Sequence, residues 1–152
     1  MKVSVATPVG SICLEADEAL ITGIGWDEGP PVTARTPDFL ADAARQLLGY
    51  FEGSLTRFDV PLSLGPGTFQ VRFQKALLEI PFGDTLTYGE LAKELGVSAQ
   101  AIGQACGANR LPVIVPCHRV LGANGLGGFS GGVGVETKVA LLKHEGAAGL
   151  LI

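Results

Sequence analysis

The stretch LTYGELAKELGVSAQAIGQACG, residues 86–107, decides what kind of fold this chain forms. Leu91 and Leu95 lie at helical spacing and are followed by Gly96, a residue type that commonly ends helices. After a three-residue turn, Ser98 is a good N-cap for a second short helix. Two short helices joined in this way predict a helix-turn-helix. The alternative is an ordinary helical hairpin that packs only on its own domain.

The second helix of the pair, residues 99–107, carries mostly small and uncharged side chains. Such a helix can closely approach a neighbouring helix or the groove of a nucleic acid. Its residues are poor readers of base edges, which argues against a sequence-specific transcription regulator. The net charge of −4 does not by itself predict DNA binding, although residues 1–66 hold most of the excess acid, with nine acidic and four basic residues.

Downstream of the helix pair, residues 112–120 read PVIVPCHRV and place a cysteine next to a histidine. A thiolate is the reactive form of cysteine, and an ordinary thiol with a pKa of ~8.5 is mostly protonated at neutral pH. In the turn after Pro116, Cys117 and His118 could converge directly or through a water, and a carboxylate such as Glu145 could orient the imidazole. Taken alone, the adjacent pair more often marks a buried structural thiol.

The tripeptide GPG at 65–67 divides the chain into two predicted domains, residues 1–64 and 65–152. Before it, alternating apolar residues predict strands over 3–5, 12–16, 19–26 and 58–64, with a helix from an N-cap at Thr36 to Gly53. After it, helical spacing predicts a helix capped by Thr68 and a last helix over about 136–144. A loop with seven glycines in fourteen residues, 121–134, precedes that last helix.

Composition excludes several classes of protein. A chain of 152 residues that is 47% hydrophobic can bury a core and is not predicted to be disordered. No apolar stretch suits a bilayer and the first residues show no secretory pattern, so we expect no membrane partner and a cytoplasmic location. Three widely spaced cysteines fit reduced thiols. Cys106, Cys117 and His118 lack the spacing of a zinc site, and no nucleotide or haem motif is present, so neither a metal nor a cofactor is expected.

With these features in order, the chain resembles the O6-alkylguanine-DNA alkyltransferases. The resemblance covers residues 68–146 closely and the first half only in its general layout. It rests on VPCHRV at 115–120, reinforced by IPFG at 80–83, TY at 87–88, GAN at 107–109, SGG at 130–132 and KHEG at 143–146.

The resemblance implies an α/β (α+β) protein with a small ribonuclease-H-like domain over residues 1–64 and a winged helix-turn-helix domain over residues 65–152. It implies DNA repair by a single-turnover methyltransferase, which moves an alkyl group from guanine O6 to Cys117, with thymine O4 as a second candidate position. The expected partner is duplex DNA, bound in the minor groove with the damaged base flipped out, and the expected state is a monomer.

The resemblance also implies roles for five residues. Cys117 would attack the alkyl carbon, and His118 would remove the thiol proton through a water. Glu145 would orient His118, and Asn109 would brace the turn before Cys117. Tyr88 would donate a proton to the departing guanine.

A second set of residues is expected to contact DNA or the base. Gln100 and its small neighbours would face the minor groove, the backbone of Val120 would read the base edge, and Ser130 with the glycine loop would close the pocket. Arg119 suits a structural hydrogen-bond donor better than a phosphate contact. The full expected set is Ala99, Gln100, Ala101, Gly103, Cys106, Arg119, Val120, Phe129 and Ser130.

The chain departs from the family pattern at three places. Gln100 stands where the family usually has an arginine that enters the base stack, and Phe129 where it often has tyrosine. Only Cys13 remains of the ligands that form a structural zinc site in some members. The departure at Gln100 keeps open a non-catalytic protein that binds the lesion and flags it for another repair pathway. A Cys-His-Glu hydrolase is a further alternative, which would show multiple turnover.

Overall fold

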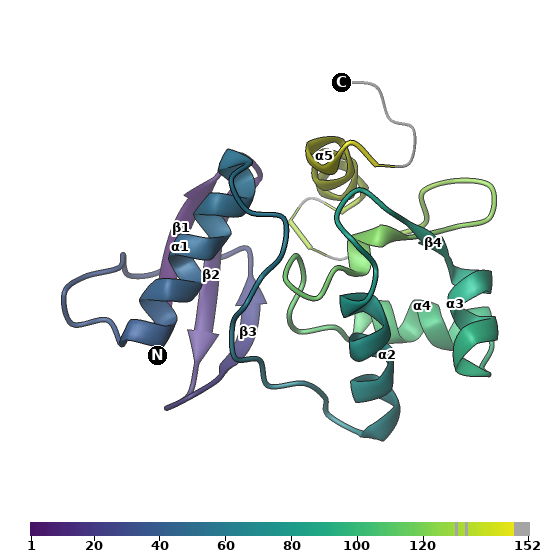
Figure 1. Ribbon diagram of the computed structural model, residues 1–152, viewed down its shortest axis with the longest axis horizontal. Coiled ribbons are helices and arrows are strands. Elements are labelled where there is room, and N and C mark those ends of the chain that lie inside the picture. Colours follow the sequence, from purple (N-terminus) through teal and green to yellow (C-terminus); the bar gives the residue numbers. More distant parts are fainter. Residues whose placement is uncertain (130, 133, 148–152) are drawn as a thin grey trace. The chain divides into compact units, whose positions relative to one another are not determined.

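The computed structural model describes residues 1–129, 131–132 and 134–147. The chain forms two compact units, residues 1–63 and residues 64 onward. Both combine helices with small sheets, so the expected mixed α/β class is confirmed (Figure 1). None of the helices in the described part of the chain has the length and apolar character that a bilayer span needs.

The first unit is an antiparallel three-stranded sheet with one helix on its face. Strands β1 (Lys2–Thr7), β2 (Gly10–Ala16) and β3 (Ile21–Gly25) follow one another in sheet order, and helix α1 (Asp38–Glu52) lies across them (Figure 1). In β1 the alternation predicted from the sequence matches the burial, since Val3 and Val5 are buried and pair with the buried Leu14 and Ile12. In β2, Cys13 between these two partners is buried as well. Helix α1 contributes Leu40, Ala43 and Leu47 to the same core.

Helix α1 begins later than predicted. Pro37 is its N-cap, and Thr36 uses its hydroxyl to accept a hydrogen bond from the backbone N–H of Thr33 rather than to cap the helix. The predicted end is correct: Gly53 adopts a left-handed φ of 84° and its N–H reaches the carbonyls of Gly49 and Tyr50.

The strand predicted over residues 58–64 does not form. This segment makes only one bridge, between Leu62 and Ile21, in which Ile21 donates to the carbonyl of Pro61 and accepts from the N–H of Ser63. Pro61 has no N–H, so the pairing cannot continue along the segment as a ladder. The alternation of apolar residues there reflects burial against the unit and not membership of the sheet.

The second unit contains the helix-turn-helix. Helix α2 (Thr68–Leu78) is followed by β4 (Leu86–Thr87), α3 (Tyr88–Leu95) and α4 (Ala99–Gly107). A short 3-10 helix (Cys117–Arg119) leads into β5 (Val120–Leu121), which pairs in parallel with β4, and α5 (Val135–Glu145) ends the unit.

Local caps explain why the helix pair forms where the sequence predicts it. Thr87 and Glu90 make a reciprocal capping box at the start of α3, Gly96 ends that helix with a φ of 72°, and Ser98 accepts from the N–H of Ala101 at the start of α4. At α2 the prediction is off by one residue, because Gly67 is the N-cap and Thr68 is already helical.

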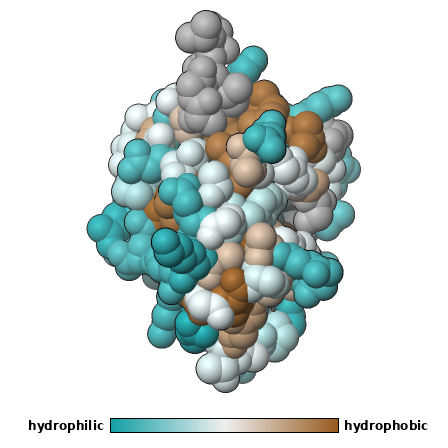
Figure 2. Space-filling view, turned by 90° about the vertical axis from the view of Figure 1, so that its right-hand side faces the viewer, coloured by the Kyte–Doolittle hydropathy of each residue, from teal (hydrophilic) through white to brown (hydrophobic). Residues whose placement is uncertain are grey.

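Buried leucine and isoleucine side chains join these helices into one core. Leu91 of α3, Ile102 of α4 and Leu141 of α5 are fully buried, as are Phe73 and Leu77 of α2. On the face of the molecule that carries α3, hydrophobic residues reach the surface in several separate areas among hydrophilic ones (Figure 2).

Candidate active site

A tight turn presents Cys117. The N–H of Val115 donates to the carbonyl of Leu111 at 2.8 Å, and Pro116, with φ −81° and ψ 68°, forms an inverse γ-turn. That turn directs the N–H of Cys117 back to the carbonyl of Val115 at 2.8 Å. The backbone before the cysteine is strained, since the buried and β-branched Val113 has a φ of 73°. Such strain persists only where the surroundings fix it.

Asn109 helps to hold the strained backbone before Cys117 in place. Its Nδ2 donates to the carbonyl of Val115 at 3.0 Å, and its Oδ1 accepts from the N–H of Leu111 at 3.1 Å and from Nε2 of Gln74 at 3.2 Å. Because it holds both ends of the turn, Asn109 lies where the sequence analysis expected a brace. A side-chain hydrogen bond from Asn109 also lowers the pKa of Cys117.

His118, Arg119 and Glu145 form a buried charged cluster. Nε2 of His118 lies 2.8 Å from Oε2 of Glu145, and both side chains are inaccessible to solvent. Arg119 contacts the same carboxylate through Nε at 2.8 Å and Nη2 at 2.9 Å, and its Nη1 donates to the carbonyl of Ile80 at 2.6 Å. The donors of Arg119 are thus used inside the protein, which fits the structural role. Bidentate pairing compensates for the buried charge of Glu145.

Burial keeps the thiol and the imidazole in their neutral forms. Burial raises the pKa of Cys117, opposed in part by Asn109 and by the charge of Lys138. Burial also lowers the pKa of His118, opposed by its hydrogen bond and charge interaction with Glu145. Nδ1 of His118 makes no hydrogen bond with any residue that the structure describes. Glu145 is an acceptor, so it places the ring proton on Nε2 and leaves the lone pair on Nδ1.

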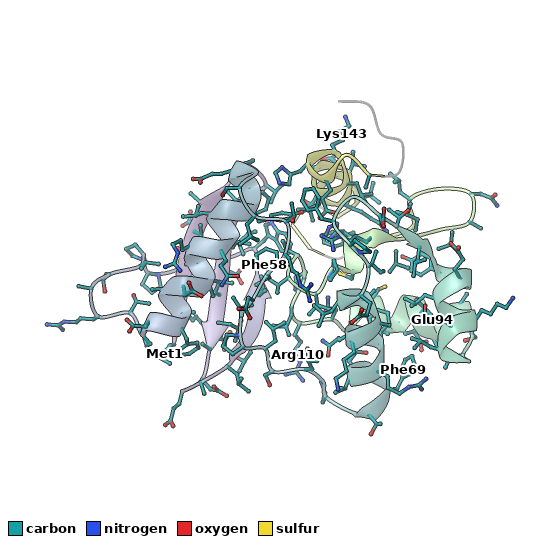
Figure 3. All side chains as sticks on the ribbon, in the orientation of Figure 1. Met1, Phe58, Phe69, Glu94, Arg110 and Lys143 are labelled. Carbon is teal, nitrogen blue, oxygen red and sulfur yellow. The ribbon has the colours of Figure 1, made fainter. Side chains whose placement is uncertain are left out.

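Lys138 is a site residue that sequence reasoning missed, because lysine side chains usually lie in solvent. It is fully buried, and its Nζ donates to the carbonyls of Val120 at 2.7 Å and Gly128 at 3.2 Å. Lys143, on the same helix, is half-exposed and projects outward from α5 (Figure 3). Helical spacing could have indicated the burial of Lys138. It lies three and four residues before the buried Leu141 and Leu142, on one face of α5.

Tyr88 lies under the glycine loop. A Cβ built on Gly127 would lie 2.7 Å from Cε2 of Tyr88 and 2.9 Å from its hydroxyl, so the loop backbone covers the ring closely. The ring also faces Nζ of Lys138, 5.7 Å from its centroid. Burial is the main influence that raises the pKa of Tyr88, while a hydrogen bond from the backbone of Gly128 lowers it. The phenol therefore keeps its proton at neutral pH.

Helix α4 presents an uncharged surface beside this site. Ala99, Gln100 and Gly103 are exposed, Ala101 is half-buried, and Ile102 faces the core. Cys106, on the same helix, is also half-buried, and burial raises the pKa of its thiol to about 12. This value makes Cys106 a poor nucleophile at neutral pH.

Two family models together match nearly the whole chain. The 6-O-methylguanine DNA methyltransferase DNA-binding domain matches residues 68–147, and the ribonuclease-like domain of the same family matches residues 2–64. The chain belongs to the 6-O-methylguanine DNA methyltransferase family. The resemblance stated from the sequence is therefore confirmed.

Relatives of known name agree with this membership. A methylated-DNA–protein-cysteine methyltransferase of Mycobacterium bovis is 43% identical over 150 residues, which cover 93% of this chain and 90% of the relative. One from Methanosarcina acetivorans is 41% identical and is covered over 95% of its length. The crystal structure of Mycobacterium tuberculosis OGT in complex with DNA superposes with a TM-score of 0.82 at 40% identity, covering 95% of this chain and 92% of that one.

Most residues expected from the family pattern lie together in the second unit. Cys117, His118, Glu145 and Asn109 surround the turn, and Tyr88 joins them through the glycine loop and Lys138. Val120 presents its carbonyl to Lys138. Phe129 is half-buried within the glycine loop. Ser130 lies outside the described residues. Within the described ranges, no three Cys, His, Asp or Glu side chains are grouped as metal ligands would be.

Proposed function

We propose that this protein repairs DNA by transferring an alkyl group from guanine O6 to Sγ of Cys117, once per molecule. Family membership and the named methyltransferase relatives support this activity. The single observation that carries the assignment to Cys117 is the cluster around it: a buried thiol, held by Asn109, next to a neutral imidazole whose proton is fixed by Glu145.

The roles of the residues follow from their hydrogen bonds. Nδ1 of His118 is the basic nitrogen, and it takes the thiol proton of Cys117 through a water. The Cys117 sulfur then attacks the alkyl carbon, the carbon–O6 bond breaks, and a thioether forms. Tyr88, which is protonated at neutral pH, gives its proton to the departing guanine. Since a thioether is a stable product, the protein is consumed and needs no cofactor.

We further infer that α4 lies against the DNA. Its exposed residues, among them Ala99, Gln100 and Gly103, allow close approach to the minor groove without strong base reading. Reaching the buried Cys117 requires the base to leave the duplex and the glycine loop to move off Tyr88. The DNA complex of the Mycobacterium tuberculosis relative supports DNA as the partner.

We also propose that residues 1–64 act as the ribonuclease-like domain and residues 65–152 as the DNA-binding and active-site domain, in a monomer. Three free cysteines support a reducing, cytoplasmic location.

Intact-protein mass spectrometry after mixing with excess duplex containing O6-methylguanine tests the function. We expect one added methyl group per molecule, mapped to the peptide that holds Cys117. Cys106→Ala should still gain one methyl group per molecule, and Cys117→Ala should gain none. An unchanged mass with lesion DNA still bound in a gel shift would instead support a lesion-binding protein. A duplex with O4-methylthymine, tested in parallel, shows whether the second position is accepted.

A further inference from the structure

We infer that Gln74 is a positioning residue for the reaction, which fixes the Asn109 amide in the orientation that Cys117 needs. This inference rests on the proposed function and adds a residue that none of the expected site positions includes. Gln74 lies on α2, and its side chain is completely buried.

Both ends of the Gln74 amide are bonded. Oε1 accepts from the backbone N–H of Gly65 at 2.7 Å, and Nε2 donates to Oδ1 of Asn109 at 3.2 Å. An unpaired amide in a core carries a large desolvation cost, so both bonds matter in a fully buried side chain.

The chain of bonds has one self-consistent direction. The N–H of Gly65 can only donate, so it fixes Oε1 of Gln74 on its side and turns Nε2 toward Asn109. Asn109 must then present Oδ1 to Gln74, which turns its Nδ2 toward the carbonyl of Val115. The N–H of Gly65 at one end and the carbonyl of Val115 at the other thus fix the orientation of the two side-chain amides between them.

This direction reaches the thiol. With Nδ2 on the side of Val115, Asn109 holds the same carbonyl that accepts the N–H of Cys117. Burial raises the pKa of the Cys117 thiol, and the side-chain hydrogen bond from Asn109 opposes that rise. If the amide turned over, an oxygen would replace that donor and would also face the carbonyl of Val115. Gln74 therefore opposes the one rotation of Asn109 that would disfavour the thiolate.

Gln70, one helical turn earlier on α2, provides a matched comparison. Its side chain is 8% exposed, and Nε2 donates to the carbonyl of Ala105 on α4 at 3.0 Å. It anchors a neighbouring piece of backbone from the same face of the same helix, but it makes no hydrogen bond to the Asn109 side chain. A loss of packing alone should therefore affect Gln70 and Gln74 variants alike.

The test compares Gln74→Met with Gln70→Met in the full chain. Iodoacetamide labelling of Cys117, followed by peptide mass mapping across pH, reports the titration of the thiol, and single-turnover transfer from O6-methylguanine duplex reports the reaction. We expect Gln74→Met to slow both about 3- to 10-fold, the effect of one lost hydrogen bond, and to move the labelling profile to higher pH. Gln70→Met should leave the labelling profile at the wild-type position.

The variant Gln74→Glu provides a second test of the same inference. A protonated carboxyl can accept from Gly65 and donate to Asn109 as the amide does, whereas an ionised one can only accept. The transfer rate of this variant relative to wild type should therefore fall as pH rises.

Coincident labelling profiles for Gln74→Met and Gln70→Met would overturn the inference. Should Gln74→Met fail to fold, a pH-independent rate ratio for Gln74→Glu would overturn it. Labelling is independent of DNA, so a wild type that labels normally but transfers nothing would reject the proposed function alone.

Discussion

Cys117 is subject to opposing influences at the scale of single residues. Burial favours the thiol, while Asn109 and Lys138 favour the thiolate. A buried lysine that donates to two backbone carbonyls is held in place, so its charge acts at a fixed position near the sulfur.

Lys138→Met should therefore slow methyl transfer by roughly 10-fold or more and shift iodoacetamide labelling of Cys117 to higher pH, because the methionine keeps the apolar stem and removes the charge. Lys143→Met, on the outer side of the same helix, is the control and should react at the wild-type rate. Equal rates for the two variants would contradict a role for the buried charge.

His118 predicts how stability depends on pH. Burial lowers its pKa in the folded state below the ordinary value of about 6.5, so the unfolded chain binds a proton first as the solution is acidified. Its contribution is fully present above that value and is lost as pH falls through the folded pKa. Urea unfolding should give a smaller free energy of unfolding at pH 5 than at pH 7, and His118→Asn should flatten this dependence. An equally steep dependence in the variant would assign it to other groups.

At the scale of elements, the glycine loop over Tyr88 has no room for a side chain at Gly127. Gly127→Ala would place a methyl carbon 2.7 Å from Cε2 of Tyr88, which is closer than van der Waals contact allows, at a φ of 73°. We expect a loss of about 1–3 kcal/mol of local stability and slower transfer, since the loop must find another position over the site. Gly125→Ala is the control, because nothing lies within 4 Å of its Cβ. Single-turnover rates and thermal unfolding of both variants provide the measurement.

Helix α4 carries an exposed, uncharged Gln100 at the position that we propose enters the base stack. Gln100→Arg should raise the transfer rate at subsaturating protein by roughly 5-fold, the effect of about 1 kcal/mol of cation–π stacking. Gln104→Arg adds the same charge one turn later on the exposed surface and should change only DNA affinity. If both variants increased the transfer rate equally, net charge and not stacking would be the cause.

Elements defined by local contacts were predictable from the sequence, and elements defined by distant ones were not. The helix pair follows from Thr87, Gly96 and Ser98, which satisfy backbone groups within four residues of themselves. The strand expected over 58–64 failed because Pro61 has no N–H, so the single bridge to Ile21 does not extend into a ladder. The contact of His118 with Glu145 was expected from the family motif. The burial of Lys138 instead depends on the carbonyls of Val120 and Gly128, 18 and 10 residues away, whose positions the sequence does not reveal.

At the scale of the whole molecule, alkylation should lower the stability of the protein. Cys117 is 6% exposed, so a methyl group that replaces the thiol proton must fit into a packed site. Overpacking of this kind costs about 1–3 kcal/mol. We expect the methylated protein to melt on the order of 5 °C below the unmodified one in a calorimetric scan. Cys106→Ala should show the same decrease, and an unchanged melting temperature would mean that the site relaxes without cost.

The bond between Gly65 and Gln74 also matters to anyone who shortens this chain. A fragment trimmed to the matched DNA-binding region would start at Thr68 and would discard the N–H that orients the buried amide. The shortest reactive fragment should instead retain Gly65, three residues before the helix begins. For the design of self-labelling tags from this chain, that glycine and not the start of α2 marks the point at which truncation should stop.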